Sequence, residues 1–476
     1  MKKIVLLMIL MVATITACSD DLSSVNVDTK SPTQVPADVL VSNATKSLVD
    51  FMVSTDVNTN IFKMIAQYWT ETTYTDEANY NLIERNVNGN LWTILYRDVL
   101  KDLKEAKRIL AENPQGGLSP EQIANQDAMI SVLEVYTWHV LVDTFGDIPY
   151  TEALDLENSS PVYDDDDDAI YADLVVRLDE AISKFTPGAG TFGAADYLYG
   201  GDASGWMKFA NSLKLRLAMR YAGVDDAKAA SMANEAITSG VIETQENNAA
   251  MQYQASAPNT NPIWEDLVQS GRLDFVAANT LVDIMNNLED PRRDDYFAEN
   301  QETYIGGVYA ANGNTHSNST IYSELFEDPT LEGVLIDLAE VEFLRAEAAA
   351  RGYTSESAEE HYAQGITASI VYWGGTEAEA SSYLASSGAS YSPAKWQELI
   401  GTQKWIALYN RGFEAWSSWR KLEYPVLADA AESGLPVPLR FTYPTSEQSL
   451  NGANLEAAQS AIGGDEQQTQ VFWDVN

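Results

Sequence analysis

The feature that most constrains the fold is a repeated helical spacing of large apolar residues. Trp206, Phe209, Leu213, Leu217 and Tyr221 recur at intervals of three and four, which places them on one stripe of a helix facing a core. Similar stripes run through residues 91–110, 128–142, 170–182, 335–350 and 396–419. Glycine and proline pairs separate the stripes. The chain is therefore predicted to be mainly α-helical, without a low-complexity linker that would divide it.

Two stretches have the pattern of helix–turn–helix pairs. They span residues 213–237, with a turn at Gly223, and residues 338–370, with a turn at Gly352. Small side chains that would let the paired helices approach closely are Ala230, Ala233, Ala346 and Ala349. This arrangement is typical of tetratricopeptide repeats. Segments without helical period lie around 71–90, 186–204, 245–270 and 299–330, and ordered loops of that length are usually functional.

The N-terminus predicts export and lipid anchoring. Lys2 and Lys3 precede an apolar run over residues 4–12 that is too short to span a bilayer, so residues 1–17 are predicted to be a lipoprotein signal peptide. The signal ends at Ile15-Thr16-Ala17-Cys18, which resembles a lipobox. Cys18 is the only cysteine, which leaves lipidation as its one obvious role and removes disulfides. Residues 18–40 are predicted to be an extended tether and residues 41–476 the body.

Charge narrows the possible partners and the location. The formal net charge is −41, which repels phosphate backbones, so nucleic-acid binding is excluded and polyanionic substrates are disfavoured. Ser19-Asp20-Asp21 follows the anchor cysteine; this resembles a signal for the outer leaflet of the outer membrane, although a solvated tether would also be acidic. We expect an outer-membrane, lipid-anchored protein exposed on the cell surface.

The sequence offers little catalytic chemistry. The three histidines, His139, His316 and His361, are far apart and lack metal-ligand spacing. With 70 carboxylates, acid–base pairs arise by chance, so they do not indicate a glycosidase. Asp164–Asp168 could wrap calcium. The run precedes a helix expected to start near Ala169, however, and helix capping is the favoured interpretation. No catalytic residue, metal or cofactor is predicted.

The aromatic residues of the loops are the informative signal. Sugar rings pack on flat Trp or Tyr faces while their hydroxyls pair with amides, so glycan sites mix both kinds of side chain. The ligand-binding candidates chosen on this basis are Trp69, Tyr74, Asn79, Tyr80, Asn261, Trp264, Tyr304 and Tyr309, with Asn81, Asn259, Asn312 and Asn314 beside them. Trp138, Trp206, Trp405 and Trp416 lie on helical stripes and are expected in the core.

Several segments resemble the SusD/RagB family, in order along the chain. They are Gly146-Asp147-Ile148-Pro149-Tyr150 with Glu152-Ala153-Leu154, residues 201–216 with Trp206-Met207-Lys208-Phe209-Ala210-Asn211, Glu342–Ala348, Gln403–Leu408, Trp416–Arg420, Pro438-Leu439-Arg440, and Phe472-Trp473-Asp474. The resemblance implies a single helical SusD-like domain of tetratricopeptide-like pairs with long loop insertions. It also implies a SusC-like TonB-dependent transporter as partner, covered by the lipoprotein as a lid. Because the family's ligand contacts have no motif here, no binding residue is carried over from it.

These observations favour a non-enzymatic protein that captures a neutral or weakly charged oligosaccharide and delivers it to the transporter. The alternatives are a peptide-binding protein of the same kind, a purely structural lid and a secreted glycoside hydrolase, which would need a carboxylate pair with a raised pKa in a cleft. Replacing Tyr74 or Trp264 by Ala is expected to weaken ligand binding without unfolding the protein.

Overall fold

The computed structural model describes residues 35–112, 114, 116–155, 157–164, 166–298, 303–386 and 388–475. The signal peptide, Cys18 and most of the predicted tether lie outside these residues. The first described helix, α2 (Ala37–Val53), begins within the range expected for the tether. Residues Ala37–Asn476 form one compact unit.

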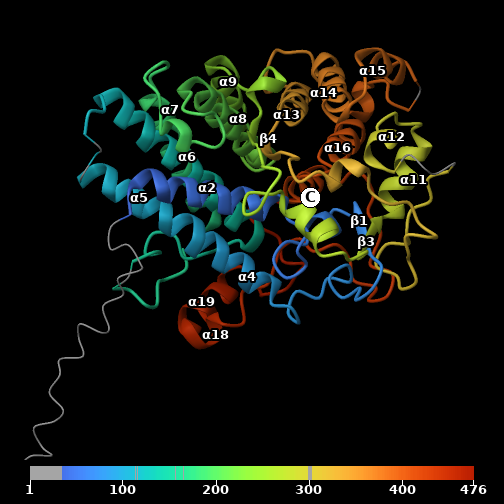
Figure 1. The fold of residues 1–476 in the computed structure, drawn as a ribbon, viewed down its shortest axis with the longest axis horizontal. Helices are drawn as coiled ribbons and strands as arrows, with labels where there is room; N and C mark the ends of the chain where they lie inside the picture. Colours follow the sequence, from blue (N-terminus) through green and yellow to red (C-terminus); the bar gives the residue numbers. More distant parts are fainter. Residues whose placement is uncertain are drawn as a thin grey trace, which may run out of the picture. The chain divides into compact units, whose positions relative to one another are not determined.

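Four antiparallel helix pairs form the scaffold. They are α6 (Pro120–Phe145) with α7 (Asp167–Lys184), α8 (Ala203–Tyr221) with α9 (Asp226–Ser239), α13 (Leu338–Ala350) with α14 (Ala358–Trp373), and α16 (Trp396–Ala407) with α17 (Gly412–Leu422). Helices of successive pairs also pack on one another, and Figure 1 shows the series running from cyan through green to orange. The mainly helical, paired architecture predicted from the stripes is confirmed.

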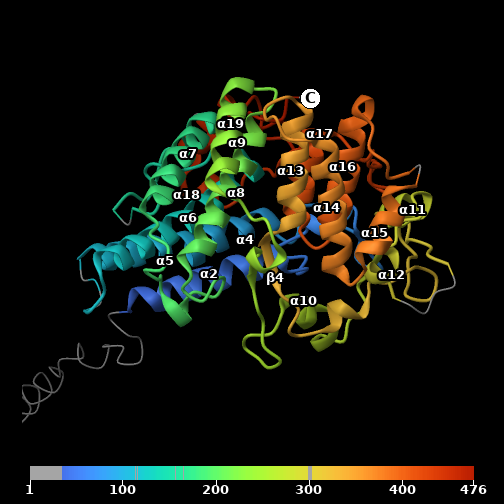
Figure 2. The same ribbon diagram turned by 90° about the horizontal axis from the view of Figure 1, so that it is seen from above.

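The remaining elements cover the scaffold or connect its pairs. The helices are α3 (Phe62–Ile65), α4 (Val87–Thr93), α5 (Lys101–Glu112), α10 (Pro262–Trp264), α11 (Asn279–Asn287), α12 (Arg293–Tyr296), α15 (Glu377–Leu384), α18 (Glu447–Leu450) and α19 (Gly452–Ala461). Short π- or 3-10 segments are η2 (Ile94–Leu100), η3 (Gly193–Ala195), η4 (Gln245–Asn247), η5 (Glu265–Gln269), η6 (Glu324–Glu327) and η7 (Pro393–Lys395). In Figure 2 the helix pairs lie on one side of the strands and of α10.

Caps and turn residues explain where the helices begin and end. Asp202 and Asp225 cap α8 and α9 by accepting from backbone N–H groups, which satisfies donors that a helix start leaves free. The turns of the two predicted pairs fall at Gly223 and Gly352, both with positive φ, a conformation that glycine adopts without steric cost. Gly146 ends α6 with a φ of 76°, a value that glycine adopts without steric cost.

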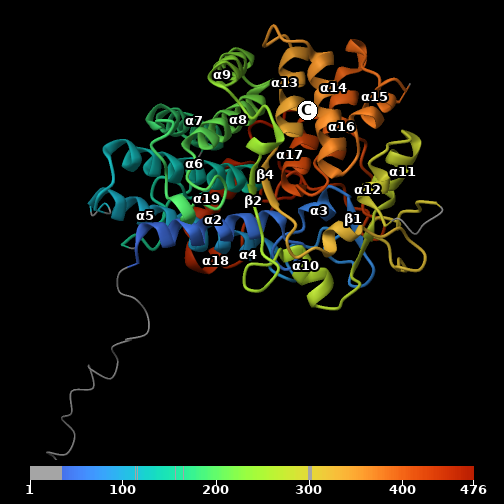
Figure 3. The same cartoon turned by 45° about the horizontal axis from the view of Figure 1, so that its top comes forward.

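Two short antiparallel ribbons interrupt the helical fold. β1 (Trp69–Glu71) pairs with β3 (Phe275–Ala277), and β2 (Ala249–Met251) pairs with β4 (Gly333–Ile336). β4 corrects one expectation: the first residues of the 335–350 stripe belong to this strand, and Asp337 caps α13 only afterwards. Figure 3 shows β1 and α3 lying beneath the red and orange helices of the C-terminal part.

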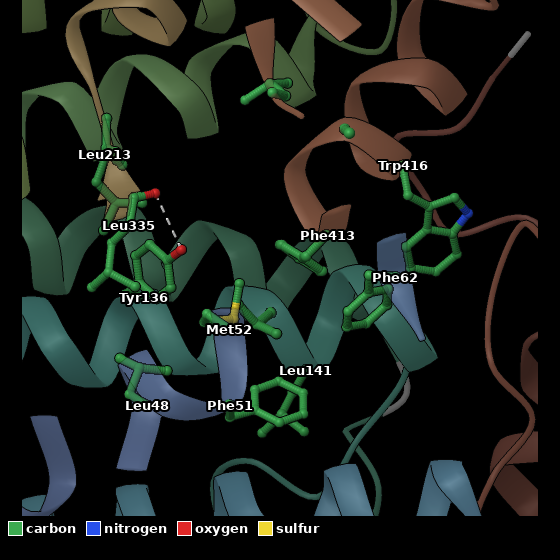
Figure 4. Packing of buried hydrophobic residues seen from close by; sticks show 14 of the residues in the cluster. Leu48, Phe51, Met52, Phe62, Tyr136, Leu141, Leu213, Leu335, Phe413 and Trp416 are labelled. Carbon is green, nitrogen blue, oxygen red and sulfur yellow. Dashed lines mark hydrogen bonds between the residues drawn. The ribbon is translucent and has the colours of Figure 1, made fainter. Parts of the chain in front are cut away.

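The hydrophobic core joins elements from the whole described chain. Leu48 and Phe51 of α2, Tyr136 of α6 and Phe413 of α17 are buried together, as Figure 4 shows. The Tyr136 hydroxyl donates to the carbonyl of Leu335, which ties α6 to β4. The four tryptophans expected in the core, Trp138, Trp206, Trp405 and Trp416, are all buried. None of the helices within the described ranges is long and apolar enough to cross a membrane.

Buried ion pairs cross-link the helix pairs, and one of their residues, Arg216, belongs to a family motif. Arg216 of α8 makes a bidentate pair with Glu340 of α13, at 2.7 and 2.9 Å. Arg411, just before α17, donates to the same carboxylate at 2.6 Å. Arg220 pairs with Glu414 at 2.7 Å. Such charges are stable in a core only when paired, so these residues serve the scaffold.

Candidate functional site

A cleft of about 200 Å³ lies at one end of the β1–β3 ribbon. Two stretches of the chain, within residues 55–85 and 266–275, build it, and the lining residues are Thr55, Asp56, Val57, Asn58, Glu71, Thr73, Tyr74, Arg85, Asp266, Ser270, Arg272, Asp274 and Phe275. Glu71 lies opposite Phe275 in the ribbon. The Thr72 amide donates to the carbonyl of Asp274 at 2.8 Å, which extends the pairing to the rim of the cleft.

The opposite wall is fixed by one carboxylate. Asp266 of η5 accepts from the amide of Thr55 at 3.2 Å and from its hydroxyl at 2.9 Å. These bonds hold the loop after α2 against η5. Burial, the larger cause, and neighbouring Asp56 raise the pKa of Asp266 to about 6. The carboxylate is therefore largely ionised at neutral pH.

Tyr74 supplies the aromatic surface of the cleft. Its side chain is 66% exposed, and its φ of 57° is uncommon for a bulky residue and turns the loop sharply after β1. Exposed aromatic rings beside polar groups suit the C–H face of a sugar. Of the candidates chosen from the sequence, Tyr74 is the one that lines this cleft.

Two guanidinium groups face the same space, and each has a carboxylate partner. Arg85 pairs with Glu77 at 2.5 Å, and Arg272 pairs with Asp274. Guanidinium groups donate several hydrogen bonds in a fixed geometry. With Asn58, Thr73 and Ser270 also lining the cleft, the site offers donors and acceptors around one aromatic face.

A buried lysine lies behind the Asp266 wall. The Lys63 amine donates to the carbonyls of Val53 and Ser54 at the end of α2. Burial lowers its pKa to about 7, although Asp266 acts in the opposite direction. Lys63 is absent from the cleft lining, so it belongs to the support of the site.

Four of the sequence candidates must be corrected, because they are buried. Trp69 is 1% exposed; its indole N–H donates to the Tyr409 hydroxyl at 2.8 Å, and its ring packs on Phe275 and Tyr322. Tyr80 and Tyr309 are buried side by side. Asn261 is buried and caps α10 by accepting from Ile263. These side chains stabilise the loops and are not open to a ligand in this structure.

Asn79, Tyr304 and Trp264 lie outside the cleft. The Asn79 amide donates to the carbonyls of Thr75 and Ala310, so it fastens one loop to another. The Tyr304 hydroxyl donates to Asp294 at 2.7 Å. Trp264 is half-buried in α10. The eight candidate residues therefore do not converge on a single site.

Sequence reasoning missed most of the polar lining. Arg85 and Asp266 lie within two of the predicted loops, and Asp56 and Asn58 lie in a loop that was not singled out. The candidate residues were aromatics with amides nearby in the sequence. Arginines and aspartates in the same loops were a usable signal, but only the fold shows which of them meet.

His139 lies in the core, and aspartates of the 164–168 run bind backbone amides. His139 is buried, and burial lowers its pKa to about 4. Asp166 caps α7 by accepting from the Asp168 amide, and Asp164 accepts from the amides of Tyr150 and Thr151. Among the residues that the structure covers, no cluster of His, Cys, Asp and Glu side chains is arranged to hold a metal.

Comparison with known proteins gives a consistent family match. A family model described as SusD-like, "Starch-binding associating with outer membrane", matches residues 29–444. No curated protein shows a significant sequence match.

Solved structures extend the likeness over nearly the whole chain. A chitin-binding SusD homologue from Flavobacterium johnsoniae is 25% identical with a TM-score of 0.75, covering 93% of this chain and 98% of its own. A SusD homologue from Bacteroides uniformis is 27% identical with a TM-score of 0.75, covering 92% and 99%. A protein titled chitin-binding protein is 24% identical with a TM-score of 0.80, covering 92% and 100%.

Proposed function

Since the chain belongs to the SusD-like family of non-catalytic, outer-membrane-associated binding proteins, we propose that it captures oligosaccharides in the cleft beside Tyr74. The observation that carries the proposal is the exposed Tyr74 ring among paired charges and hydroxyls. Stacking on this ring would hold a sugar, and the surrounding groups would orient it. The cleft is small, so it fits one or two sugar units of a longer chain.

The chemistry of the cleft favours neutral sugars. Each guanidinium is offset by a carboxylate, and Asp56 and Asp266 add negative charge. An anionic sugar would thus meet no unpaired cation among the lining groups. Two related structures are titled as chitin-binding, so chitin oligosaccharides, which are neutral, are the first ligands to test.

The delivery role and the location are further parts of the proposal. The family description places its members at the outer membrane. We infer that this protein is anchored there through Cys18 and passes its sugar to a SusC-like TonB-dependent transporter, for which it is the lid. Copurification with such a transporter from the native membrane tests the partnership.

The binding test is a calorimetric titration of residues 19–476 with tetra-N-acetylchitotetraose, maltotetraose and a tetrapeptide. Saturable heat with a sugar is the expected result, with affinity weakened in Tyr74→Ala and unchanged in Tyr197→Ala. Tyr197 is a matched control, because it is also exposed but absent from the cleft. Heat only with the peptide would point to peptide cargo. Absence of heat throughout, with copurification, would indicate a structural lid.

A further inference from the structure

The aromatic loop of the cleft, residues 72–80, is held by one asparagine side chain. The Asn79 amide group donates to the carbonyl of Thr75 at 2.8 Å and to the carbonyl of Ala310 at 2.9 Å. Its oxygen accepts from two backbone amides of the 430–435 loop, at 3.3 and 2.9 Å. A primary amide has two N–H donors and an oxygen with two acceptor sites. All four hydrogen-bonding positions are therefore used within the protein, and none is left for a sugar.

The two segments that Asn79 joins to its own loop are themselves fixed beside β1. The Ala310 amide donates to the Thr70 hydroxyl of β1 at 3.0 Å. Ahead of the 430–435 loop, Ala428 makes two hydrogen bonds with the buried Gln67 side chain, at 2.6 and 3.3 Å. Asn79 is thus bonded to segments whose positions are set by residues of β1 and of the chain just before it.

Glu432 adds a second set of bonds at the same junction. One oxygen of its carboxylate accepts from the backbone amide of Asn312 at 2.9 Å and from the Asn312 side chain. The other oxygen accepts from the Thr75 hydroxyl at 3.5 Å. Thr75 directly follows Tyr74 in the chain. Both the carbonyl and the hydroxyl of the residue next to Tyr74 are therefore bonded at this junction.

Tyr74 depends on such support, because most of its side chain is exposed and its backbone is in the left-handed region. This conformation is costly for a bulky residue and persists only where the surrounding structure enforces it. We propose that Asn79 is a positioning residue of the cleft, which joins the three loops and so holds Tyr74 in the conformation that presents its ring to a sugar. The proposal rests on the proposed sugar-binding function of the cleft.

Asn79 should influence affinity through Tyr74 alone, and a double-variant cycle tests this. Asn79→Ala is expected to weaken binding of tetra-N-acetylchitotetraose by up to the about two- to tenfold loss of Tyr74→Ala, the value of one stacking contact. Since both substitutions remove the same contact, the double variant should bind as Tyr74→Ala does. Calorimetry on residues 19–476 measures the four affinities. Losses that multiply in the double variant, or unchanged affinity in Asn79→Ala, would overturn the proposal.

Asn125 provides the matched control. Its amide group donates to the carbonyls of Thr186 at 3.0 Å and Gly190 at 2.9 Å, and its oxygen accepts from the Thr186 amide at 2.7 Å. It thus joins α6 to a loop in the same way as Asn79 joins its loops, but it is absent from the cleft lining. Asn125→Ala should lower the melting temperature and leave affinity unchanged. An affinity loss equal to that of Asn79→Ala would trace both losses to reduced stability and overturn the positioning role.

Hydrogen exchange without ligand tests the positioning independently of the sugar. The amides of residues 72–80 should exchange severalfold faster in Asn79→Ala than in the wild type, while those of α8 remain unchanged. Unchanged exchange over residues 72–80 would overturn the proposal. If Asn79→Ala does not fold, Glu432→Ala, at an exposed position of the same junction, replaces it in both measurements. Absence of sugar binding by the wild type would instead reject the proposed sugar class, and the exchange result would still decide whether Asn79 fixes the loop.

Discussion

The helix-pair scaffold and the loop-built cleft use charged residues in opposite ways. In the scaffold, Arg216 and Glu340 are buried and matched at short distance. In the cleft, Arg85 and Arg272 are partly exposed, and each carboxylate partner leaves some donors free for solvent or ligand. In this chain, therefore, the buried charged residues of the helices hold the helices together, whereas the charges of the cleft lie on loop residues that belong to no family motif.

The largest effect is expected from breaking the scaffold network at Glu340. Glu340→Ala leaves the guanidinium groups of Arg216 and Arg411 buried without this partner. The free energy of unfolding should fall by about 5 kcal/mol, at the upper end for a broken buried pair. Urea unfolding followed by circular dichroism measures it. Glu456→Ala, an exposed glutamate of α19, should change stability by less than about 0.5 kcal/mol.

Trp69→Ala should have the next largest effect on stability. It tests whether Trp69 belongs to the core and not to the ligand site. Trp69→Ala removes a buried indole and its bond to Tyr409, so the free energy of unfolding should fall by about 3–5 kcal/mol. The same urea titration applies. A stable Trp69→Ala variant with reduced sugar affinity would show that the ring contacts ligand after all.

Tyr74→Ala should have the opposite pattern to Trp69→Ala: it should lower sugar affinity and leave stability almost unchanged. Tyr74→Ala is expected to weaken sugar binding about two- to tenfold, since aromatic stacking contributes about 0.5–1.5 kcal/mol. Its stability should change by less than about 0.5 kcal/mol, because the ring is exposed. Calorimetry and urea unfolding on the same sample separate the two quantities. Equal loss of both would place Tyr74 with the scaffold.

Trp264 should have the smallest effect on binding. The sequence predicted a binding loss for Trp264→Ala, but the side chain lies outside the lining of the cleft. We now expect an affinity within about twofold of the wild type. A loss as large as that of Tyr74→Ala would mean that a longer sugar extends from the cleft across α10.

The sequence predicted the scaffold far better than the cleft, for a physical reason. A helix buries one stripe, so the spacing from Trp206 to Tyr221 reports its structure locally. The cleft depends on contacts between distant segments, such as Thr55 with Asp266, which no local pattern contains. Tyr74 and Trp69 were both chosen as loop aromatics near amides, and only the fold shows that Tyr74 is exposed and that Trp69 is buried.

The most direct test of the central claim is a crystal structure of residues 19–476 with the oligosaccharide that gives saturable heat. We predict a sugar ring stacked on Tyr74, with an oxygen within hydrogen-bond distance of the Arg85 guanidinium. A sugar bound elsewhere, with the cleft beside Tyr74 empty, would contradict it.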